Sequence, residues 1–336
     1  MDLILTMVGT AASVPTAARG TSATLIARGG QRWLVDCGEG TQRQLMRSGL
    51  GLVDLDLVLL THLHGDHYLG LPGLLKSYGL RDRERSLTVV GPRGLAALMA
   101  AMRPVIGKVP FPLHLHESDG GVVWVGEGAR IEAVPTRHSV ASLGYALVED
   151  LRPGAFDPAA ARALGVPEGP QWGRLQRGAV VPGSGGEPVR PDQVMGPARP
   201  GRRIVLSGDT EPCEAVLEAA RGATVLIHEA TFLDEDRERA RQTRHSTARE
   251  AAALAREADV GLLVITHVSS RCMPRDVRAE AAVEFPRVVV PRDFDQIEVP
   301  FPEKGPPEVH PARAPQGPRA AQAASEEPAT VPAHDL

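Results

Sequence analysis

Three histidines and one aspartate, packed into the six residues HLHGDH directly after a short apolar run, constrain this chain more than any other feature. In an extended segment His62 and His64 point to the same side. A turn at Gly65 lets Asp66 and His67 swing towards a second position. One ion does not need all four of these groups. The motif therefore predicts a metal site, and more specifically a two-metal site, at the end of a buried strand.

The donor types limit which metals fit. Imidazole nitrogen and carboxylate oxygen suit zinc best among the common metals, and iron and manganese also accept them. The bland alternative is a polar loop whose histidines only make hydrogen bonds. The density of ligands in this motif favours the metal site over that alternative.

Composition sets the class of molecule. A chain of 336 residues with 43% hydrophobic content and a net charge of -4 can bury a full core, as one large domain plus insertions. The sequence contains no run of eighteen apolar residues, and its first residues resemble a strand rather than an export signal. We therefore expect a cytoplasmic enzyme without a membrane segment. Cys37, Cys213 and Cys272 are too few and too scattered for a disulfide framework, so we expect reduced thiols.

Short apolar segments alternate with helical patterns along most of the chain, which predicts a layered α/β fold. The strands are expected at residues 3–7, 23–27, 33–36, 57–60, 87–90, 130–134, 203–206, 224–227 and 261–265. The helices are expected at residues 41–48, 69–78, 95–102, 212–220 and 247–257.

Residues 151–203 interrupt this pattern with many prolines and glycines, and we expect no compact core there. Eight arginines stand against four acidic residues in this stretch. It is either an arm that touches a polyanion or a solvated linker. The end of the chain, residues 303–336, has no periodic apolar pattern and is expected to be a disordered tail, which leaves 1–302 as the catalytic domain.

Further metal ligands are expected where other buried strands end. His138, Asp209 and His267 each follow an apolar strand-like segment, and open α/β sheets place their sites at the carboxyl ends of strands. Asp209, with two carboxylate oxygens, is the best bridge between two metals. By contrast, His114 and His116 lack a carboxylate cluster at the right turn and are assigned to structure or surface, and His310 and His334 to the tail.

Glu229 and His245 form a candidate acid–base pair. A hydrogen bond between them would keep the imidazole protonated and oriented, as a general acid requires. The segment after His245 has a second interpretation, because Thr247 and Glu250 match a capping box for the following helix. Both interpretations can hold together.

These residues resemble the ribonuclease Z family of the metallo-β-lactamase superfamily, over roughly residues 1 to 300. The resemblance rests on segments 9–10, 15–16, 36–42, 61–75, 208–210, 228–231, 245–247, 266–267 and 269–271. The segment 169–175 is similar to part of that family's RNA-binding exosite arm. This similarity favours a clamp for tRNA over a linker as the interpretation of the insertion at residues 151–203.

The resemblance implies a four-layer αββα sandwich that carries a flexible exosite arm and works as a homodimer on precursor tRNA. One subunit's arm would hold a tRNA whose end lies in the other's site. It also implies two Zn²⁺ ions per subunit: one held by His62, His64, His138 and Asp209, the other by Asp66, His67, Asp209 and His267. In the arm, Gly169, Pro170, Arg174 and Arg177 are the expected substrate-binding residues.

The implied activity is removal of the 3′ trailer from precursor tRNA, leaving a 3′-hydroxyl on the tRNA and a 5′-phosphate on the trailer. Bound metal lowers the pKa of water to about 7. Asp66 is the expected general base, and His245, oriented by Glu229, the expected general acid for the leaving oxygen.

Two rivals remain at this point. A small-molecule phosphodiesterase or arylsulfatase of the same superfamily would use the same ions but would not need a basic arm. A non-catalytic RNA-binding or structural protein would have lost part of the ligand set, which is complete here. The sequence also departs from the family pattern, with Cys272 where an aromatic residue is common and with a loop at residues 49–54 that lacks the Pro-Lys-Arg character of some members. The second departure leaves the cleavage position relative to CCA open.

Overall fold

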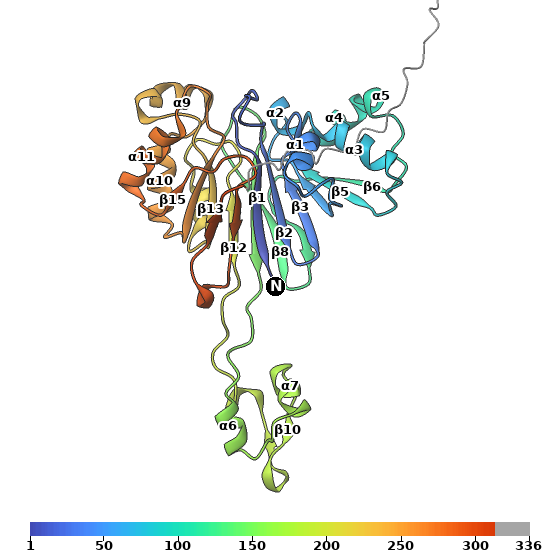
Figure 1. The fold of residues 1–336 in the computed structure, drawn as a ribbon, viewed down its shortest axis with the longest axis vertical. Helices are drawn as coiled ribbons and strands as arrows, with labels where there is room; N and C mark the ends of the chain where they lie inside the picture. The colour runs from blue at the N-terminus through green and yellow to red at the C-terminus, as the bar shows by residue number, and fades with distance from the viewer. Residues whose placement is uncertain (313–336) are drawn as a thin grey trace, which may run out of the picture.

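Two β-sheets packed face to face form the body of the protein, with helices on both outer faces (Figure 1). The structure is a computed structural model, and it describes residues 1–312. The first sheet has eight strands in the order β17-β16-β1-β2-β3-β4-β5-β6. Their bounds are β1 Leu3–Gly9, β2 Ala23–Arg28, β3 Gln31–Val35, β4 Leu57–Leu59, β5 Leu87–Gly91, β6 Leu113–Glu117, β16 Gln296–Glu298 and β17 Glu308–His310.

The second sheet has seven strands in the order β15-β14-β13-β12-β9-β8-β7. Their bounds are β7 Gly121–Gly126, β8 Ala129–Pro135, β9 Leu143–Glu149, β12 Arg203–Leu206, β13 Val225–Glu229, β14 Leu262–Thr266 and β15 Val288–Val289. Strands β3 to β6 run parallel in the first sheet, and β12 to β15 run parallel in the second. Parallel neighbours need crossover connections, and helices supply them.

The crossover helices form the two outer layers. One layer holds α1 Thr41–Arg47, α2 Gly65–Tyr68, α3 Leu71–Leu80, α4 Leu95–Ala101 and α5 Arg103–Ile106. The other holds α8 Glu214–Ala220, α9 Arg237–Thr243, α10 Ala248–Glu257 and α11 Pro274–Glu284, with a short 3₁₀ turn, η3 Asp234–Asp236, before α9.

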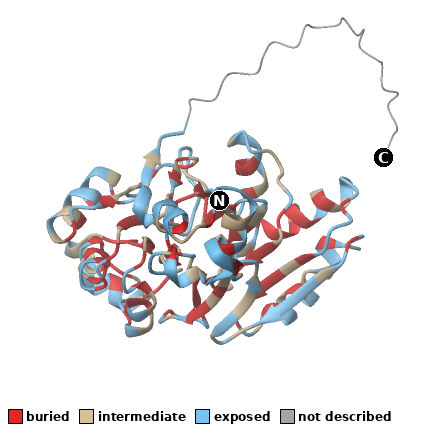
Figure 2. Cartoon of the chain, turned by 90° about the horizontal axis from the view of Figure 1, so that it is seen from below, coloured by how far each residue is buried: buried red, intermediate tan, exposed pale blue. Residues whose placement is uncertain are grey.

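Three apolar clusters lie between the four layers. The central cluster joins the facing sheets and includes Trp33 and Tyr145, which are both buried. The other two pack α1, α3 and α4 against the first sheet and α8, α10 and α11 against the second. Buried residues accordingly occupy the interior of the layers, and exposed residues lie on the outside (Figure 2). The predicted four-layer αββα sandwich is confirmed.

The insertion between β9 and β12 projects from the body as a small module on two extended segments (Figure 1). The module contains α6 Pro158–Ala163, α7 Pro170–Gln176, the hairpin of β10 Val181–Pro182 and β11 Pro188–Val189, and the 3₁₀ turns η1 Ser184–Gly186 and η2 Pro191–Gln193.

The expectation that no compact core forms in this insertion was wrong. Six residues bury their side chains together: Ala161, Val166, Leu175, Val181, Val189 and Val194. Phe156 and Trp172 pack against this cluster with ring centroids 5.1 Å apart. We call this module, residues 151–202, the arm.

Phe301 and Glu303 contact the base of the arm. Two guanidinium groups pack on the Phe301 ring, with Arg152 at 3.6 Å and Arg202 at 4.1 Å from its centroid. Glu303 accepts hydrogen bonds from Arg152 at 2.8 Å and Arg199 at 3.1 Å. The arm therefore leaves the body from a packed base.

The boundary of the predicted C-terminal tail was also wrong. A 3₁₀ turn, η4 Pro302–Lys304, is followed by β17, which adds to the edge of the first sheet by pairing with β16. His310, assigned to the tail from sequence, lies in this strand. The rest of the predicted tail, residues 313–336 with His334, lies outside the described residues. Among the described residues, no helix combines the length and the apolar character needed to cross a membrane.

Candidate metal centre

All seven predicted metal ligands lie at one edge of the two sheets, in the loops and the short helix α2 that follow strand ends. His62, His64 and the start of α2 follow β4, and His138 follows β8. Asp209 and His267 follow β12 and β14. The strands that deliver these residues point the same way within each sheet, so their carboxyl ends meet at a common site.

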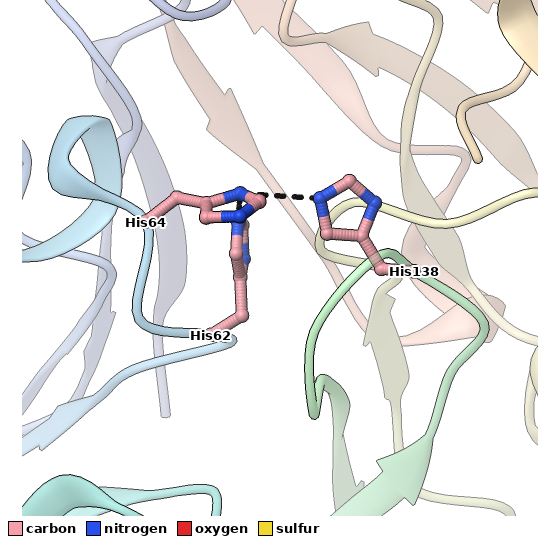
Figure 3. A group of neighbouring side chains, drawn as sticks. All are labelled: His62, His64 and His138. Atoms are coloured by element: carbon pink, nitrogen blue, oxygen red, sulfur yellow. Dashed lines mark hydrogen bonds between the residues drawn. The ribbon is translucent and has the colours of Figure 1, made fainter. Parts of the chain in front are cut away.

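Three histidines form a first group (Figure 3). His62 Nε2 lies 3.0 Å from His64 Nδ1, and His64 Nδ1 lies 3.2 Å from His138 Nε2. Burial lowers the pKa of each of these imidazoles, which keeps them neutral with a lone pair available. Three neutral ring nitrogens at this separation suit a shared cation.

Asp66, His67, Asp209 and His267 form a second group. His67 Nε2 lies 3.4 Å from Oδ2 of Asp66, from Oδ2 of Asp209 and from Nε2 of His267. His267 Nε2 lies 3.3 Å from the same two carboxylate oxygens. Ligands held about 2.0 to 2.1 Å from a tetrahedral zinc are roughly 3.4 Å from one another. The spacing of this donor set therefore fits a metal ion.

Asp209 lies between the two groups. Its Oδ2 is 3.8 Å from His62 Nε2 in the first group and within 3.4 Å of both histidines in the second. Burial raises the pKa of this carboxyl, but the adjacent imidazoles of His267 and His67 outweigh burial and hold the pKa well below its ordinary value. An ionised carboxylate in this position can bridge two cations.

Hydrogen bonds behind the donors fix the orientation of the rings. Nδ1 of His67 lies 2.8 Å from Asp36 Oδ2, and Nδ1 of His138 lies 3.0 Å from the carbonyl oxygen of Arg244. Such outer partners place the proton on one ring nitrogen and turn the other towards the metal. Asp36 and Arg244 adopt φ values of 59° and 56°, a left-handed conformation that residues other than glycine seldom adopt and that clusters at functional sites.

The role of Asp36 was not predicted from sequence, although it obeys the same rule as the ligands. It directly follows β3, and its carboxylate also accepts hydrogen bonds from the backbone and the hydroxyl of Thr61. The signal that could have found it was an acidic residue at the end of a buried strand.

Glu229 and His245 lie beside the metal ligands as a hydrogen-bonded pair. His245 Nδ1 donates to Glu229 Oε1 at 2.6 Å. Burial lowers the pKa of His245, but the Glu229 carboxylate more than compensates and raises it to about 9. Glu229 is buried and also accepts a hydrogen bond from the backbone N–H of Thr210. The pair keeps a protonated imidazole next to the second group of donors.

The capping box after His245 is present as well. The Thr247 side chain accepts from the backbone of Glu250, and the Glu250 side chain accepts from the backbone of Thr247. This caps α10 and anchors the segment that carries His245. The two interpretations of the sequence therefore hold together.

The predicted substrate-binding residues of the arm lie apart from the metal centre. Gly169 precedes α7, Pro170 occupies its first turn, and Arg174 and Arg177 are exposed at its end. Elsewhere, His114 and His116 are exposed on β6, at the edge of the first sheet, as the assignment to structure or surface expected.

Comparison with known proteins places this geometry in a family. Residues 16–151 match the model of the metallo-beta-lactamase superfamily, and residues 189–268 match that of a beta-lactamase superfamily domain. The chain is 45% identical over 302 residues to ribonuclease Z of Methanosarcina acetivorans, covering 89% of this chain and 99% of that protein. It is 47% identical over 270 residues to ribonuclease Z of Myxococcus xanthus, covering 80% and 88%.

Among solved structures, the short form of human tRNase Z superposes with a TM-score of 0.66 at 26% identity, covering 89% of this chain and 100% of that one. The sequence relatives match at higher identity and over nearly their full lengths. The chain belongs to the ribonuclease Z family of the metallo-β-lactamase superfamily.

Proposed function

We propose that this protein is a zinc-dependent endoribonuclease that removes the 3′ trailer from precursor tRNA. The cut would leave a 3′-hydroxyl on the tRNA and a 5′-phosphate on the trailer. The observation that carries the proposal is a complete set of seven converging donors, with an acid–base pair beside them, in a chain 45% identical to a ribonuclease Z.

The donor set divides between two Zn²⁺ ions per subunit. One ion would be held by the first group, His62, His64 and His138, and the other by Asp66, His67 and His267. Asp209 would bridge them, since its Oδ2 faces both groups. Zinc bound here supplies a water of lowered pKa and positive charge against the phosphate.

Asp66 is the proposed general base. Its polar contacts within residues 1–312 run through Oδ2, which accepts from the backbone N–H of Ser13 at 2.9 Å and faces His67 and His267. Burial raises the pKa of Asp66, but the adjacent imidazoles of His267 and His67 hold it well below its ordinary value. The carboxylate is thus ionised and can accept the proton of the attacking water.

His245 is the proposed general acid. With its pKa at about 9, the imidazole carries a proton at neutral pH, and Glu229 holds Nδ1 so that Nε2 remains for the substrate. The proton would pass to the 3′-oxygen as it leaves the phosphorus. General acid catalysis of this kind contributes about 10² to 10⁴ in rate.

The arm is proposed to bind the body of the tRNA. Arg174 and Arg177 stand exposed on a module with its own core, away from the metal centre. Positive side chains at that distance can hold phosphates of a large substrate but do not reach a small one. We further propose that the protein is a cytoplasmic homodimer in which one subunit's arm serves the other's site.

The proposal is tested with purified protein, zinc and a 3′-extended precursor tRNA. Sequencing both product ends should show one cut at the 3′ side of the tRNA, with a 3′-hydroxyl and a 5′-phosphate. An Asp209→Ala variant purified in parallel should give no cut and so exclude a contaminating nuclease. An intact precursor combined with hydrolysis of bis-p-nitrophenyl phosphate would instead identify a small-molecule phosphodiesterase.

A further inference from the structure

Thr231 connects the second group of metal donors to the acid–base pair. It lies two residues beyond the end of β13 and is buried. Its Oγ1 is 2.9 Å from His267 Nδ1 and 2.7 Å from Glu229 Oε2. One hydroxyl therefore contacts both a proposed zinc ligand and the carboxylate that orients His245.

The direction of these hydrogen bonds follows from the chemistry of the partners. The Glu229 carboxylate can only accept, so the single hydroxyl proton of Thr231 goes to Oε2. The oxygen of Thr231 is then left to accept from Nδ1–H of His267. His245 Nδ1, 3.2 Å from the same oxygen, has a shorter bond to Glu229 at 2.6 Å and gives its proton there.

This chain of bonds sets the tautomer of His267. With the proton on Nδ1, the lone pair lies on Nε2, which faces Asp66 and Asp209 at 3.3 Å. His67 receives the equivalent support from Asp36. Thr231 differs from Asp36 because its bond continues to Glu229 and through it to His245.

We propose that Thr231 is a positioning residue. It fixes the orientation of the His267 ring towards the second metal ion and, through Glu229, the position of His245 relative to that ion. The inference rests on the proposed two-metal site. Loss of the hydroxyl should weaken one metal position selectively, because the donors of the first group have other partners: the carbonyl oxygen of Arg244 for His138 and the hydroxyl of Thr61 for His62.

The experiment compares Thr231→Val, Thr231→Ser and the wild type by zinc titration against a chromophoric chelator. Removing an outer partner of a metal ligand typically lowers affinity by about 10- to 100-fold. In Thr231→Val we expect the affinity for one of the two zinc ions to fall by this factor and the affinity for the other to stay at the wild-type value. In Thr231→Ser, which keeps a hydroxyl, the lost affinity should return almost completely. At saturating zinc, Thr231→Val should lower kcat on precursor tRNA and leave KM unchanged.

Thr6→Val is the matched control. Thr6 is a buried threonine on β1, and the same change there should leave the affinity for both zinc ions unchanged. If Thr231→Val does not fold, Thr231→Ala removes the hydroxyl without adding a methyl group next to His267 and carries the same test.

Wild-type affinities for both ions in the folded hydroxyl-free variant would overturn the inference, and so would a Thr231→Ser variant as defective as Thr231→Val. Equal weakening of both ions would also overturn it, because that result indicates general damage. The titration needs no RNA. A protein that shows the selective loss but does not cut precursor tRNA would therefore contradict the proposed function and leave the role of Thr231 intact.

Discussion

The metal centre and the arm differ in how they are held. Every donor of the metal centre lies in a short segment that follows a strand of the body, and most of these residues are buried and backed by a second hydrogen-bonding partner. The arm has a core of only six aliphatic residues and joins the body through two extended segments and the contacts of Phe301 at its base.

This contrast separates chemistry from recognition. Catalytic groups must be held within a fraction of an ångström, and rigid elements with supporting hydrogen bonds achieve that. Side chains that bind the phosphates of a large RNA must extend far from the centre, but they do not need to be held as rigidly as catalytic groups. Changes in the centre should therefore affect any phosphodiester, and changes in the arm should affect only a tRNA-sized substrate.

The largest expected effect is that of His245→Ala. Turnover should fall by about 10² to 10⁴ because the leaving oxygen loses its proton donor. Both zinc ions should remain, since His245 is not among their proposed ligands. Kinetics on precursor tRNA and metal analysis of the same sample check this prediction. Normal turnover by the variant would remove His245 from the mechanism.

Glu149→Gln tests the junction between the two regions. Glu149 is buried at the end of β9, where it accepts from Arg28 of the first sheet and from Arg202 at the base of the arm. Breaking a buried ion pair leaves charge without a partner and costs about 3 to 5 kcal/mol. Denaturant unfolding at pH 7 should show a loss of this size.

The stabilisation that Glu149 contributes should also depend on pH. Burial raises the pKa of Glu149, but hydrogen bonds from Arg202 and Arg28 lower it to about 2. The wild type should therefore keep this stabilisation above the ordinary glutamate pKa and lose it as the pH falls towards 2. The difference between wild type and Glu149→Gln should shrink over that window. A difference that is constant with pH would show that the carboxylate charge is not the cause.

Deletion of residues 154–198, closed with a short glycine–serine linker, sharpens the comparison directly. Losing one of two binding regions should weaken precursor tRNA binding by roughly 10²-fold. Hydrolysis of bis-p-nitrophenyl phosphate should stay at the wild-type rate. Equal loss on both substrates would mean that the deletion damaged the centre, and would contradict the separation of roles.

Arg174→Ala with Arg177→Ala should give the smallest effect. Each lost phosphate contact should make the fall of binding with salt less steep by about 1 in the log–log slope. Affinity should drop several-fold at low salt. Arg278→Ala, an exposed arginine on the outer face of α11, is the control and should leave the slope unchanged. An unchanged slope in the arm variant would count against phosphate contacts there.

The same contrast explains what could be predicted from sequence. The layers and the seven proposed ligands follow from local patterns, because each ligand lies in the short segment that follows an apolar strand such as β4, β12 or β14. The arm's core could not be predicted, since its apolar residues are spaced without helical or strand periodicity among prolines. Likewise, β17 forms only by pairing with β16, which no local pattern encodes.

The supporting contacts of the site were also beyond prediction from sequence. Asp36 meets His67 from 31 residues away, and Thr231 meets His267 from 36. Such pairs depend on how separate strand ends come together in space. The residue types were visible, but their partners were not.

The central claim is that seven side chains hold two metal ions around Asp209. A crystal structure of the zinc-loaded protein, with anomalous data collected at the zinc edge, tests it most directly. We predict two peaks in each subunit, one at His62, His64 and His138 and one at Asp66, His67 and His267, with Asp209 reaching both. A single peak, or zinc bound away from these residues in zinc-replete crystals, would contradict the account.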